Sequence, residues 1–288
     1  MSYITSTHFM QDTTITAQNG QRYIQEKLAL PNGPTVIDAE AFTNVRKIKH
    51  IVFPNTLERI EDKAFFNCTS LQELTLPDQL TKIGTGAFAR CLSLKKVTLP
   101  AFLATLPDGL FAYDSHLQSI FLPKYSQLTS IRAGAFYQCN VLSTISLPDS
   151  VRRIGNRAFY RCKKLETFRF PSMLKIIGDE AFYFCSFAEI VLPKSLEHIG
   201  DGAFTKCNQL VSVQIPESVK YIGNHAFRGC NRLKYLEIRH NPTHIGEDIV
   251  NHAATIRCFP DSTVDHYCKK YGYNVEYLHP IKSLSIWK

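Results

Sequence analysis

The chain of 288 residues contains no long apolar segment: no window approaches the roughly 18 consecutive apolar residues that a membrane-spanning helix needs. Glycine and proline are scarce, with 14 residues each, which excludes a collagen-like or low-complexity chain. The first residues, MSYITSTHFM, show no basic region followed by an apolar run, so we expect no signal peptide here. With 44% hydrophobic and 20% charged residues, the composition is that of a folded protein with a core.

Motifs of catalysis and of metal binding are also missing. The sequence contains no GxSxG, HExxH or GxxxxGK stretch, which would hold a nucleophile, a zinc ion or a phosphate. No two cysteines stand in a CxxC arrangement. We therefore expect a protein that is not an enzyme and that needs no cofactor and no metal.

Basic residues outnumber acidic ones by 33 to 25, and much of this excess lies within residues 150–175. Such a segment is either a binding site for nucleic acid, an anionic glycan or an acidic protein, or a solvated surface of uneven charge. The candidate anion-binding residues are Arg152, Arg153, Arg157, Arg161, Lys163 and Lys164.

An internal repeat is the main signal in the sequence. One unit reads LPDSVRRIGNRAFYRCKKLETFRF, from Leu147 to Phe170. Phenylalanine recurs at intervals of about 23 residues, and a second series of prolines has the same period. The phenylalanines are Phe42, Phe65, Phe88, Phe111, Phe136, Phe159, Phe182, Phe204 and Phe227. The prolines are Pro31, Pro54, Pro77, Pro100, Pro123, Pro148, Pro171, Pro193 and Pro216. Two markers with one period indicate tandem units of one architecture.

The nine cysteines follow the same register. Nine is an odd number, so they cannot all pair within the chain. Seven stand three residues after a repeat phenylalanine, which favours free thiols buried in one column over a disulfide framework. Cys258 and Cys268 lie outside this series, and we expect two free buried thiols there, although a pair between them remains an alternative. So many free thiols favour a reducing compartment.

Each unit combines two patterns. Thr167 to Phe170 alternates between polar and apolar residues, as a half-buried strand does. Ile154, Ala158, Phe159 and Cys162 have the spacing of one face of a short helix. A residue that can cap a helix precedes the Ala-Phe pair, and glycine often precedes that residue, consistent with a sharp turn. The capping residues are Asp62, Thr85, Asp108, Asn156, Asp179, Asp201 and Asn224.

A unit this short cannot bury its own apolar side, because its helix lies below the length that is stable alone in water. Stacked units solve this problem by pairing their strands into a parallel sheet. We therefore predict one elongated α/β solenoid, with about nine units over residues 31–238. Residues 1–30 are expected to form an N-terminal capping hairpin, because Asn19-Gly20 is a hairpin turn signal. Residues 239–288 should hold a degenerate repeat and a strand–helix–strand cap.

The repeat LPxxhxxIGxxAFxxCxxLxxhxhP, in which h is apolar, resembles the BspA-like bacterial leucine-rich repeat. The resemblance covers about nine units, from Leu30 to Ile238. It implies a right-handed superhelix or horseshoe, with a parallel β-sheet on the concave side and short helical turns on the convex side. The resemblance also implies a role, since members of the family with assigned roles are mostly adhesins and protein binders at the cell surface. This location differs from the reducing compartment that the free thiols favour, so the location of the protein is left open.

The outward positions of the predicted strands form the candidate binding surface. They are mixed in charge and polarity, which suits a folded protein or an extended peptide. The candidate partner-binding residues are Thr98, Phe121, Tyr125, Ser146, Arg169, Val191, Gln214 and Glu237. Two irregular units follow Pro100, the second is two residues longer, and Phe102, Phe121 and Tyr125 add aromatic surface there, which is typical of a hot spot.

The resulting hypothesis is a monomeric, non-enzymatic module that binds a protein through the sheet and its adjacent loops. The alternative is a binder of an anionic glycan or nucleic acid through residues 150–175. Strong weakening of binding by salt would distinguish this alternative from the protein-binding hypothesis.

Overall fold

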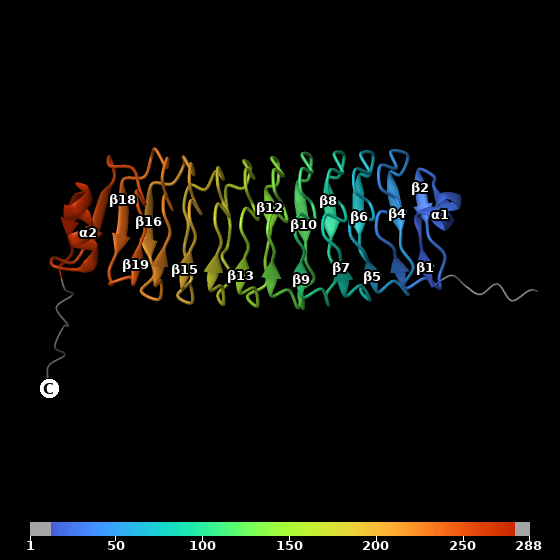
Figure 1. The fold of residues 1–288 in the computed structure, drawn as a ribbon, viewed down its shortest axis with the longest axis horizontal. Helices are drawn as coiled ribbons and strands as arrows, with labels where there is room; N and C mark the ends of the chain where they lie inside the picture. Colours follow the sequence, from blue (N-terminus) through green and yellow to red (C-terminus); the bar gives the residue numbers. More distant parts are fainter. Residues whose placement is uncertain (1–12, 280–288) are drawn as a thin grey trace, which may run out of the picture.

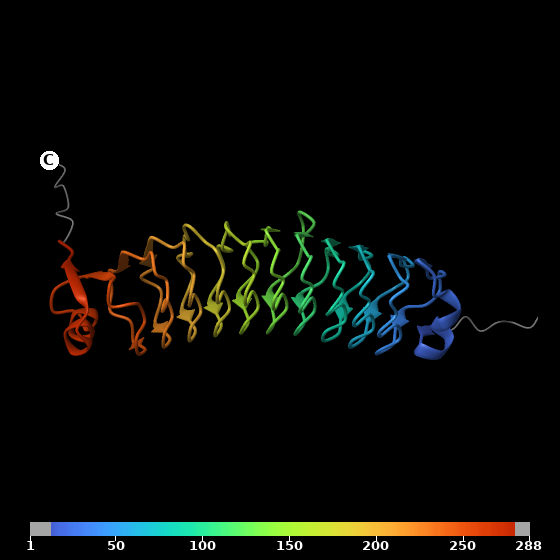
Figure 2. The same cartoon turned by 90° about the horizontal axis from the view of Figure 1, so that it is seen from above.

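The protein is an elongated, gently curved rod in which the chain winds through successive coils (Figures 1 and 2). The computed structural model describes residues 13–279. Every strand pairing in it is parallel, and paired strands come from successive coils. Within residues 13–279, no helix has the length and apolar character needed to cross a bilayer.

Each coil contributes a two-residue strand to a first ladder, in two sheets of four and seven strands. This two-residue ladder consists of β1 (Thr14–Ile15), β3 (Val36–Ile37), β5 (Arg59–Ile60), β7 (Lys82–Ile83), β9 (Thr105–Leu106), β11 (Ser130–Ile131), β13 (Arg153–Ile154), β14 (Ile176–Ile177), β15 (His198–Ile199), β17 (Tyr221–Ile222) and β19 (His244–Ile245). About eleven coils are therefore present, more than the nine units expected. The additional ones come from β1, before the first predicted unit, and from β19, in the degenerate repeat.

The second, long-strand ladder contains strands predicted from the alternating pattern, but the strand predicted at Thr167 to Phe170 is not found, because the amides there form no bonds to a neighbouring coil. Its members are β2 (Lys27–Ala29), β4 (His50–Val52), β6 (Glu73–Thr75), β8 (Lys96–Thr98), β10 (Ser119–Phe121), β12 (Thr144–Ile145), β16 (Ser212–Ile215), β18 (Tyr235–Ile238), β20 (Thr255–Cys258) and β21 (Asn274–Tyr277). In β6 the outward Glu73 and Thr75 are exposed and Leu74 is buried. Alternation therefore places one face of this ladder in the core and one in solvent.

The prediction of one strand and one helix per unit differs from the structure, in which most coils contribute two strands and the repeat segment has no helix. Ile154, assigned above to a helical face, lies in strand β13 and pairs with Ile177 of the next coil. The Ala-Phe segment forms hydrogen-bonded turns instead of a helix, so the convex-side helices are not found in the repeat coils described here. The spacing of Ile154, Ala158, Phe159 and Cys162 did not distinguish a helix from a turn, because a turn also brings residues three and four apart onto one side.

Left-handed backbone conformations explain why the turn does not continue as a helix. In the coil of Phe159, Arg157 (φ 56°) and Arg161 (φ 60°) lie two residues before and two after the ring. Right-handed helices exclude positive φ. The resulting backbone points its amides along the rod: Phe159 N donates to Ala181 O at 2.8 Å, and Arg161 N donates to Tyr183 O at 2.7 Å. The turn segment therefore bonds coil to coil.

The expected capping residues also bond to the next coil. Asp179 Oδ1 accepts a hydrogen bond from Asp201 N at 3.0 Å, and Asp201 Oδ1 accepts one from Asn224 N at 2.8 Å. A Cβ added to Gly200 would lie 2.5 Å from Asp179 Oδ1, so the preceding glycine serves this close approach. We call the row Asn156, Asp179, Asp201 and Asn224 the Asx ladder.

The core is a stack of phenylalanine rings beside a column of thiols. All nine repeat phenylalanines are fully buried, and neighbouring rings stack at centroid distances of 5.0–6.1 Å. The seven repeat cysteines are buried and free, as expected, and each donates its S–H to the phenylalanine carbonyl of the preceding coil, as Cys162 does to Phe136 O at 3.3 Å. Burial raises the pKa of Cys68 to about 12, so this thiol stays protonated.

Asp114 occupies the position of the missing cysteine in this column. Its side chain is fully buried, and Oδ1 accepts a hydrogen bond from Cys91 N at 2.8 Å. Its Oδ2 has no partner among the described residues. Burial raises the pKa of Asp114 well above its usual value, because the charged form is disfavoured away from water.

The N-terminal end differs from the expected hairpin over residues 13–30; the first twelve residues of that predicted cap lie outside the described part. Asn19-Gly20 belongs to the short helix α1 (Ala17–Gly20), followed by the 3-10 turn η1 (Gln21–Tyr23). A capping box explains this choice, since Thr16 Oγ1 accepts from Asn19 N while Asn19 Oδ1 accepts from Thr16 N. Strands β1 and β2 then pair in parallel with β3 and β4, as part of a coil.

At the C-terminal end, helix α2 (Thr263–Tyr271) lies between β20 and β21. Ser262 Oγ accepts from Asp265 N, and Gly272 (φ 73°) ends the helix in the left-handed region. Cys258 and Cys268 are both buried and free. This helix covers the last coil of the rod (Figure 1), while residues 280–288 of the predicted cap lie outside the described part.

Candidate functional site

The outward side of the long-strand ladder, with the loops that follow its strands, is the first candidate surface; we call it the strand face. The structure places the predicted partner-binding residues along it. Thr98 and Phe121 are register partners in β8 and β10, and Gln214 and Glu237 are register partners in β16 and β18. Of the predicted set, Thr98, Phe121, Tyr125, Ser146, Arg169, Val191 and Gln214 are exposed and Glu237 is partly exposed.

Large apolar side chains are exposed on this face and its adjoining loops. Phe121 is 48% exposed, Phe102 is 50% exposed and Tyr125 is 80% exposed. Phe102 and Tyr125 each stand two residues after a repeat proline, so they occupy the same position in neighbouring coils. The Lys124 ammonium lies 5.7 Å from the centre of the Tyr125 ring. The three aromatic residues form what we call the aromatic strip.

The strand face is interrupted between β12 and β16. Residues 166–170 and 187–192 are fully described, and none of their amides donates a backbone hydrogen bond to another described residue. Two hollows of about 970 Å³ and 620 Å³ lie here, with Val191 lining both. Val191 is 83% exposed. Arg169 donates to Asp149 Oδ2 at 2.9 Å and lowers the pKa of that carboxyl to about 2.

The predicted anion-binding residues are distributed along one coil. Arg153 lies in β13, Arg157 in the turn segment, and Lys163 after the buried Cys162. Arg157 forms an ion pair with Glu180. Arg161 Cζ and Lys163 Nζ lie 5.9 Å and 5.7 Å from the centre of the Phe184 ring, so these two basic residues are close together.

A second surface was missed by sequence reasoning. A shallow groove of about 1020 Å³ follows the turn segments from the coil of Phe111 to that of Phe227. The Asx ladder lines it together with tyrosines, the Arg157–Glu180 pair, and small residues that leave it hollow. Those small residues are Gly109, Ala112, Ala133, Gly134 and Gly202. We call this surface the turn groove.

Tyr113, Tyr137 and Tyr183 line the turn groove, and Tyr160 stacks between the last two without lining it. The ring centroids of Tyr137 and Tyr160 are 4.8 Å apart, and those of Tyr160 and Tyr183 are 4.6 Å apart. Burial raises the pKa of Tyr160, and the charges of Tyr183 and Glu180 add to this shift. The sequence signal was present, because three successive units read Ala-Phe-Tyr. We call these three residues the tyrosine row.

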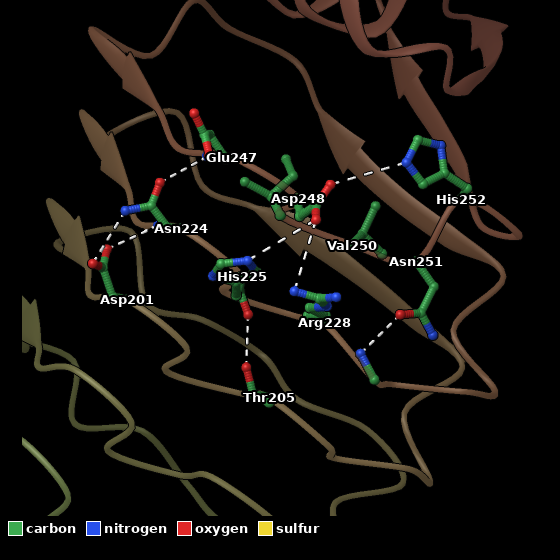
Figure 3. A network of polar contacts seen from close by, with 12 residues as sticks. Asp201, Thr205, Asn224, His225, Arg228, Glu247, Asp248, Val250, Asn251 and His252 are labelled. Atoms are coloured by element: carbon green, nitrogen blue, oxygen red, sulfur yellow. Dashed lines mark hydrogen bonds and ion pairs between the residues drawn. The ribbon is translucent and has the colours of Figure 1, made fainter.

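The groove ends at a small charged cluster (Figure 3). Asp248 lies 3.8 Å from Arg228 Nη1 and 4.0 Å from the Nε2 atoms of both His225 and His252. Asn224 joins this end to the Asx ladder by accepting from Glu247 N at 2.8 Å. Within residues 13–279, no group of three or more histidine, cysteine or acidic side chains is arranged to hold a metal ion.

A comparison with family models identifies the repeat. The model for the BspA type leucine rich repeat region matches six copies, over residues 35–144 and 129–257. The chain belongs to the BspA-type leucine-rich-repeat family. The resemblance inferred from the repeat motif is therefore confirmed. No curated protein matches the chain.

Solved bacterial leucine-rich-repeat proteins are similar to this family member. One from Eubacterium ventriosum is 25% identical with a TM-score of 0.56, over 58% of this chain and 45% of that chain. One from Bacteroides ovatus is also 25% identical, over 90% of this chain and 85% of that chain, with a TM-score of 0.45. A leucine-rich cell surface protein from Faecalibacterium prausnitzii is 21% identical, over 89% of each chain, with a TM-score of 0.40.

Proposed function

We propose that this leucine-rich-repeat protein is a non-enzymatic module that binds a protein through the strand face. The main observation behind this proposal is the aromatic strip. The side chains of Phe102, Phe121 and Tyr125 lie on neighbouring coils, and about half or more of the surface of each is exposed. Exposed aromatic residues are the usual anchors of protein interfaces. Membership of the family supports this proposal, since the fold is typical of protein-binding modules.

The coils hold these side chains in place before a partner arrives. The strands β8 and β10 that carry Thr98 and Phe121 are paired in register, and the residues beneath them are buried. A surface ordered in advance loses little conformational freedom on binding, so more of the contact energy appears as affinity. Tyr125 and Phe102 lie on short loops between paired strands, which limits their freedom as well.

A capture experiment tests the proposal. The wild-type chain is immobilised beside a triple variant with Phe102→Ser, Phe121→Ser and Tyr125→Ser, and beside the control Leu92→Ser. Leu92 is 42% exposed but lies outside the aromatic strip. Proteins held by the wild type and the control, but lost by the triple variant, would support the proposal. Equal capture by all three chains would contradict it.

Salt dependence separates this proposal from anion binding. Contacts made by the aromatic strip should persist between ~50 and ~200 mM salt, whereas binding carried by several basic residues should weaken by orders of magnitude. The ion pair between Arg157 and Glu180 supports the first result, because this candidate anion-binding residue is already paired within the protein.

A further inference from the structure

A row of cationic, aromatic and amide side chains follows the turn segments and shares no residue with the strand face. It occupies the second position after each repeat phenylalanine from Phe88 to Phe204. All six residues have positive φ, between 58° and 67°, and each donates its backbone amide to the next coil, as Arg161 N does to Tyr183 O at 2.7 Å. The backbone of the row is therefore fixed on successive coils. We call it the left-handed row, and its members are Arg90, Tyr113, Gln138, Arg161, Phe184 and Lys206.

Most residue types in this row are not those that its backbone favours. Left-handed conformations suit glycine and asparagine. The equivalent positions of other coils hold such residues, namely Asn44, Asn67 and Gly229. Long cationic and aromatic side chains adopt this conformation at a cost in free energy, and residues held in costly conformations cluster at functional sites. The choice of residues therefore points to a function of their side chains outside the core.

Three cations gather around two adjacent rings at one end of the row. Arg161 Cζ and Lys163 Nζ lie beside the Phe184 ring, at the distances given above. Lys206 Nζ lies 5.6 Å from the centre of the Tyr183 ring, and the centres of the Tyr183 and Phe184 rings are 6.3 Å apart. Aromatic faces attract cations at such distances. The rings therefore hold the three charges together, and we call Arg161, Lys163 and Lys206 the cation cluster.

Acidic residues do not neutralise the cation cluster within residues 13–279. None of its three members forms an ion pair with another residue of this range, and Arg161 Nε is buried there without a hydrogen-bond partner. Other cations of the turn segments are paired, as Arg157 is with Glu180 and Arg228 is with Asp248. The cluster therefore presents positive charge at a fixed place, which attracts an anionic group of a ligand.

The uneven spread of charge along the row indicates which anion fits. No lysine or arginine occurs in residues 112–116 or 137–141, the turn segments of the two coils before the cluster. A nucleic acid carries a charge on every nucleotide, so its phosphates would lie over these coils without a cation. The rings of the tyrosine row also cover one another's faces, which leaves little space for bases to stack on them.

A peptide can match this pattern because it combines charged and uncharged side chains. Its carboxylates would lie on the cation cluster, where lysine and arginine donate to them. Its uncharged side chains would lie against Tyr113, which is 38% exposed, and Gln138 on the preceding coils. We infer that the left-handed row binds an acidic peptide segment of a partner protein.

Binding of defined peptides tests the inference. The probes are an array of short labelled peptides in which a run of glutamates or aspartates adjoins leucine or phenylalanine. Matched peptides have glutamine or asparagine in place of the acids, and heparin and oligothymidylate serve as uniform polyanions. We expect acidic peptides to bind, and their matched amide peptides to bind about tenfold more weakly or less. Added salt should weaken the binding, because exposed charges are screened.

A triple variant removes the charges of the cation cluster. It combines Arg161→Gln, Lys163→Gln and Lys206→Gln, and its affinity for acidic peptides should fall on the order of tenfold to a hundredfold. A second variant keeps the charges by exchanging the two cationic residue types, and it should retain binding. This second variant combines Arg161→Lys, Lys163→Arg and Lys206→Arg. Circular dichroism checks that both variants keep the fold of the wild type.

The matched control removes the same net charge from another part of the surface. It combines Lys95→Gln, Arg152→Gln and Lys234→Gln. These three residues are exposed, and they directly precede β8, β13 and β18. The control should bind acidic peptides with nearly the affinity of the wild type. A loss in the cluster variant alone would therefore reflect the place of the charges and not the net charge.

Three results would overturn the inference. They are an absence of binding to every acidic peptide, equal binding by the cluster variant and the matched control, and binding of heparin or oligothymidylate through the cluster more tightly than any acidic peptide. The last result would assign the cluster to a uniform polyanion. The serine variant of the aromatic strip should still bind acidic peptides. Failure of the proposed protein interface and failure of this inference can therefore be distinguished.

Discussion

The turn side and the strand face of the same coils differ in continuity. On the turn side, every repeat phenylalanine donates its amide to the next coil, from Phe42 to Ala64 O through to Phe227 to Ile249 O. On the strand face, strand pairing is broken between β4 and β6 and again, over a longer stretch, between β12 and β16. One uninterrupted side is therefore enough to keep the coils in register, and the other side is free to vary. Variation at the strand face is what a binding surface requires.

Side-chain size and coil length account for the interruption. Phe168 and Phe170 occupy inward positions where neighbouring coils have leucine, isoleucine or valine. Both rings pack edge-on against Phe182, at 5.1 and 5.4 Å, and Phe187 contacts the same ring at 5.5 Å. The next coil also has one residue fewer between Cys185 and Phe187 than its neighbours have. Larger rings and a shorter connection keep these strands from pairing.

Removing one ring from the continuous side should have the largest effect. Phe159 is fully buried and stacks on Phe136 and Phe182. Phe159→Ala should lower the free energy of unfolding by about 3–5 kcal/mol, because it leaves a cavity between two rings. Urea denaturation of the wild type and the variant measures this loss. A melting temperature close to that of an exposed-site variant would show that the ring is not part of the core.

Restoring the thiol column should stabilise the protein. Asp114→Cys removes a buried carboxyl with an unpaired Oδ2, and the gain should be about 1–3 kcal/mol at neutral pH. The raised pKa means that the folded state keeps a proton that the unfolded state loses above about pH 4. Wild-type stability should therefore fall as pH rises above about 4, relative to the variant.

Thermal unfolding across this pH range measures the difference between the two proteins. Asp114→Asn serves as the control that removes the titration without restoring the thiol. Parallel pH profiles for the wild type and both variants would show that the carboxyl does not titrate between the folded and unfolded states.

Hydrogen exchange should distinguish the two sides over short segments of the chain. Amides of residues 167–170 and 189–192 lack backbone partners, whereas those of Phe159 and Phe182 are bonded between coils. The unpaired group should exchange on the order of tenfold faster or more, because local opening costs less there. Mass spectrometry of peptic fragments measures this contrast. Similar protection in both groups would mean that the strand face pairs in solution.

The smallest effect is expected on the paired part of the strand face. Thr75 is exposed in β6, and its side chain points away from the core. Thr75→Ala should change the free energy of unfolding by less than about 0.5 kcal/mol. Measured beside Phe159→Ala under the same conditions, it compares an outward position in one coil with an inward position in another. A loss above about 1 kcal/mol would assign Thr75 a packing role.

The repeat and the core were predictable because identical residues recur at one period. Phe159 and Cys162 have counterparts in the adjoining coils, so their burial followed from stacking alone. The turn conformation was not predictable from spacing, because it depends on positive φ at residues such as Arg157 and Arg161, where most residue types avoid it. Likewise, Asn19-Gly20 is compatible with both a hairpin and a capped helix, and the neighbouring Thr16 decides between them.

The candidate surfaces were predictable to different degrees. The outward positions of the strands followed from alternation, and Phe121 and Val191 are exposed as expected. The turn groove was missed, because its walls come from positions interpreted as helix caps. The interruption depends on how the rings of Phe168 and Phe170 share space with the next coil, which a linear pattern does not contain.

The bonding of each coil only to its neighbours has a consequence for how such a protein changes length. Duplicating or deleting one complete unit, for example residues 137–159, would bring equivalent atoms together at the new junction and leave α1 and α2 at the two ends. The chain can thus become longer or shorter in whole units without a new core. Such changes would alter the length of the rod, while the shape of each coil would stay the same.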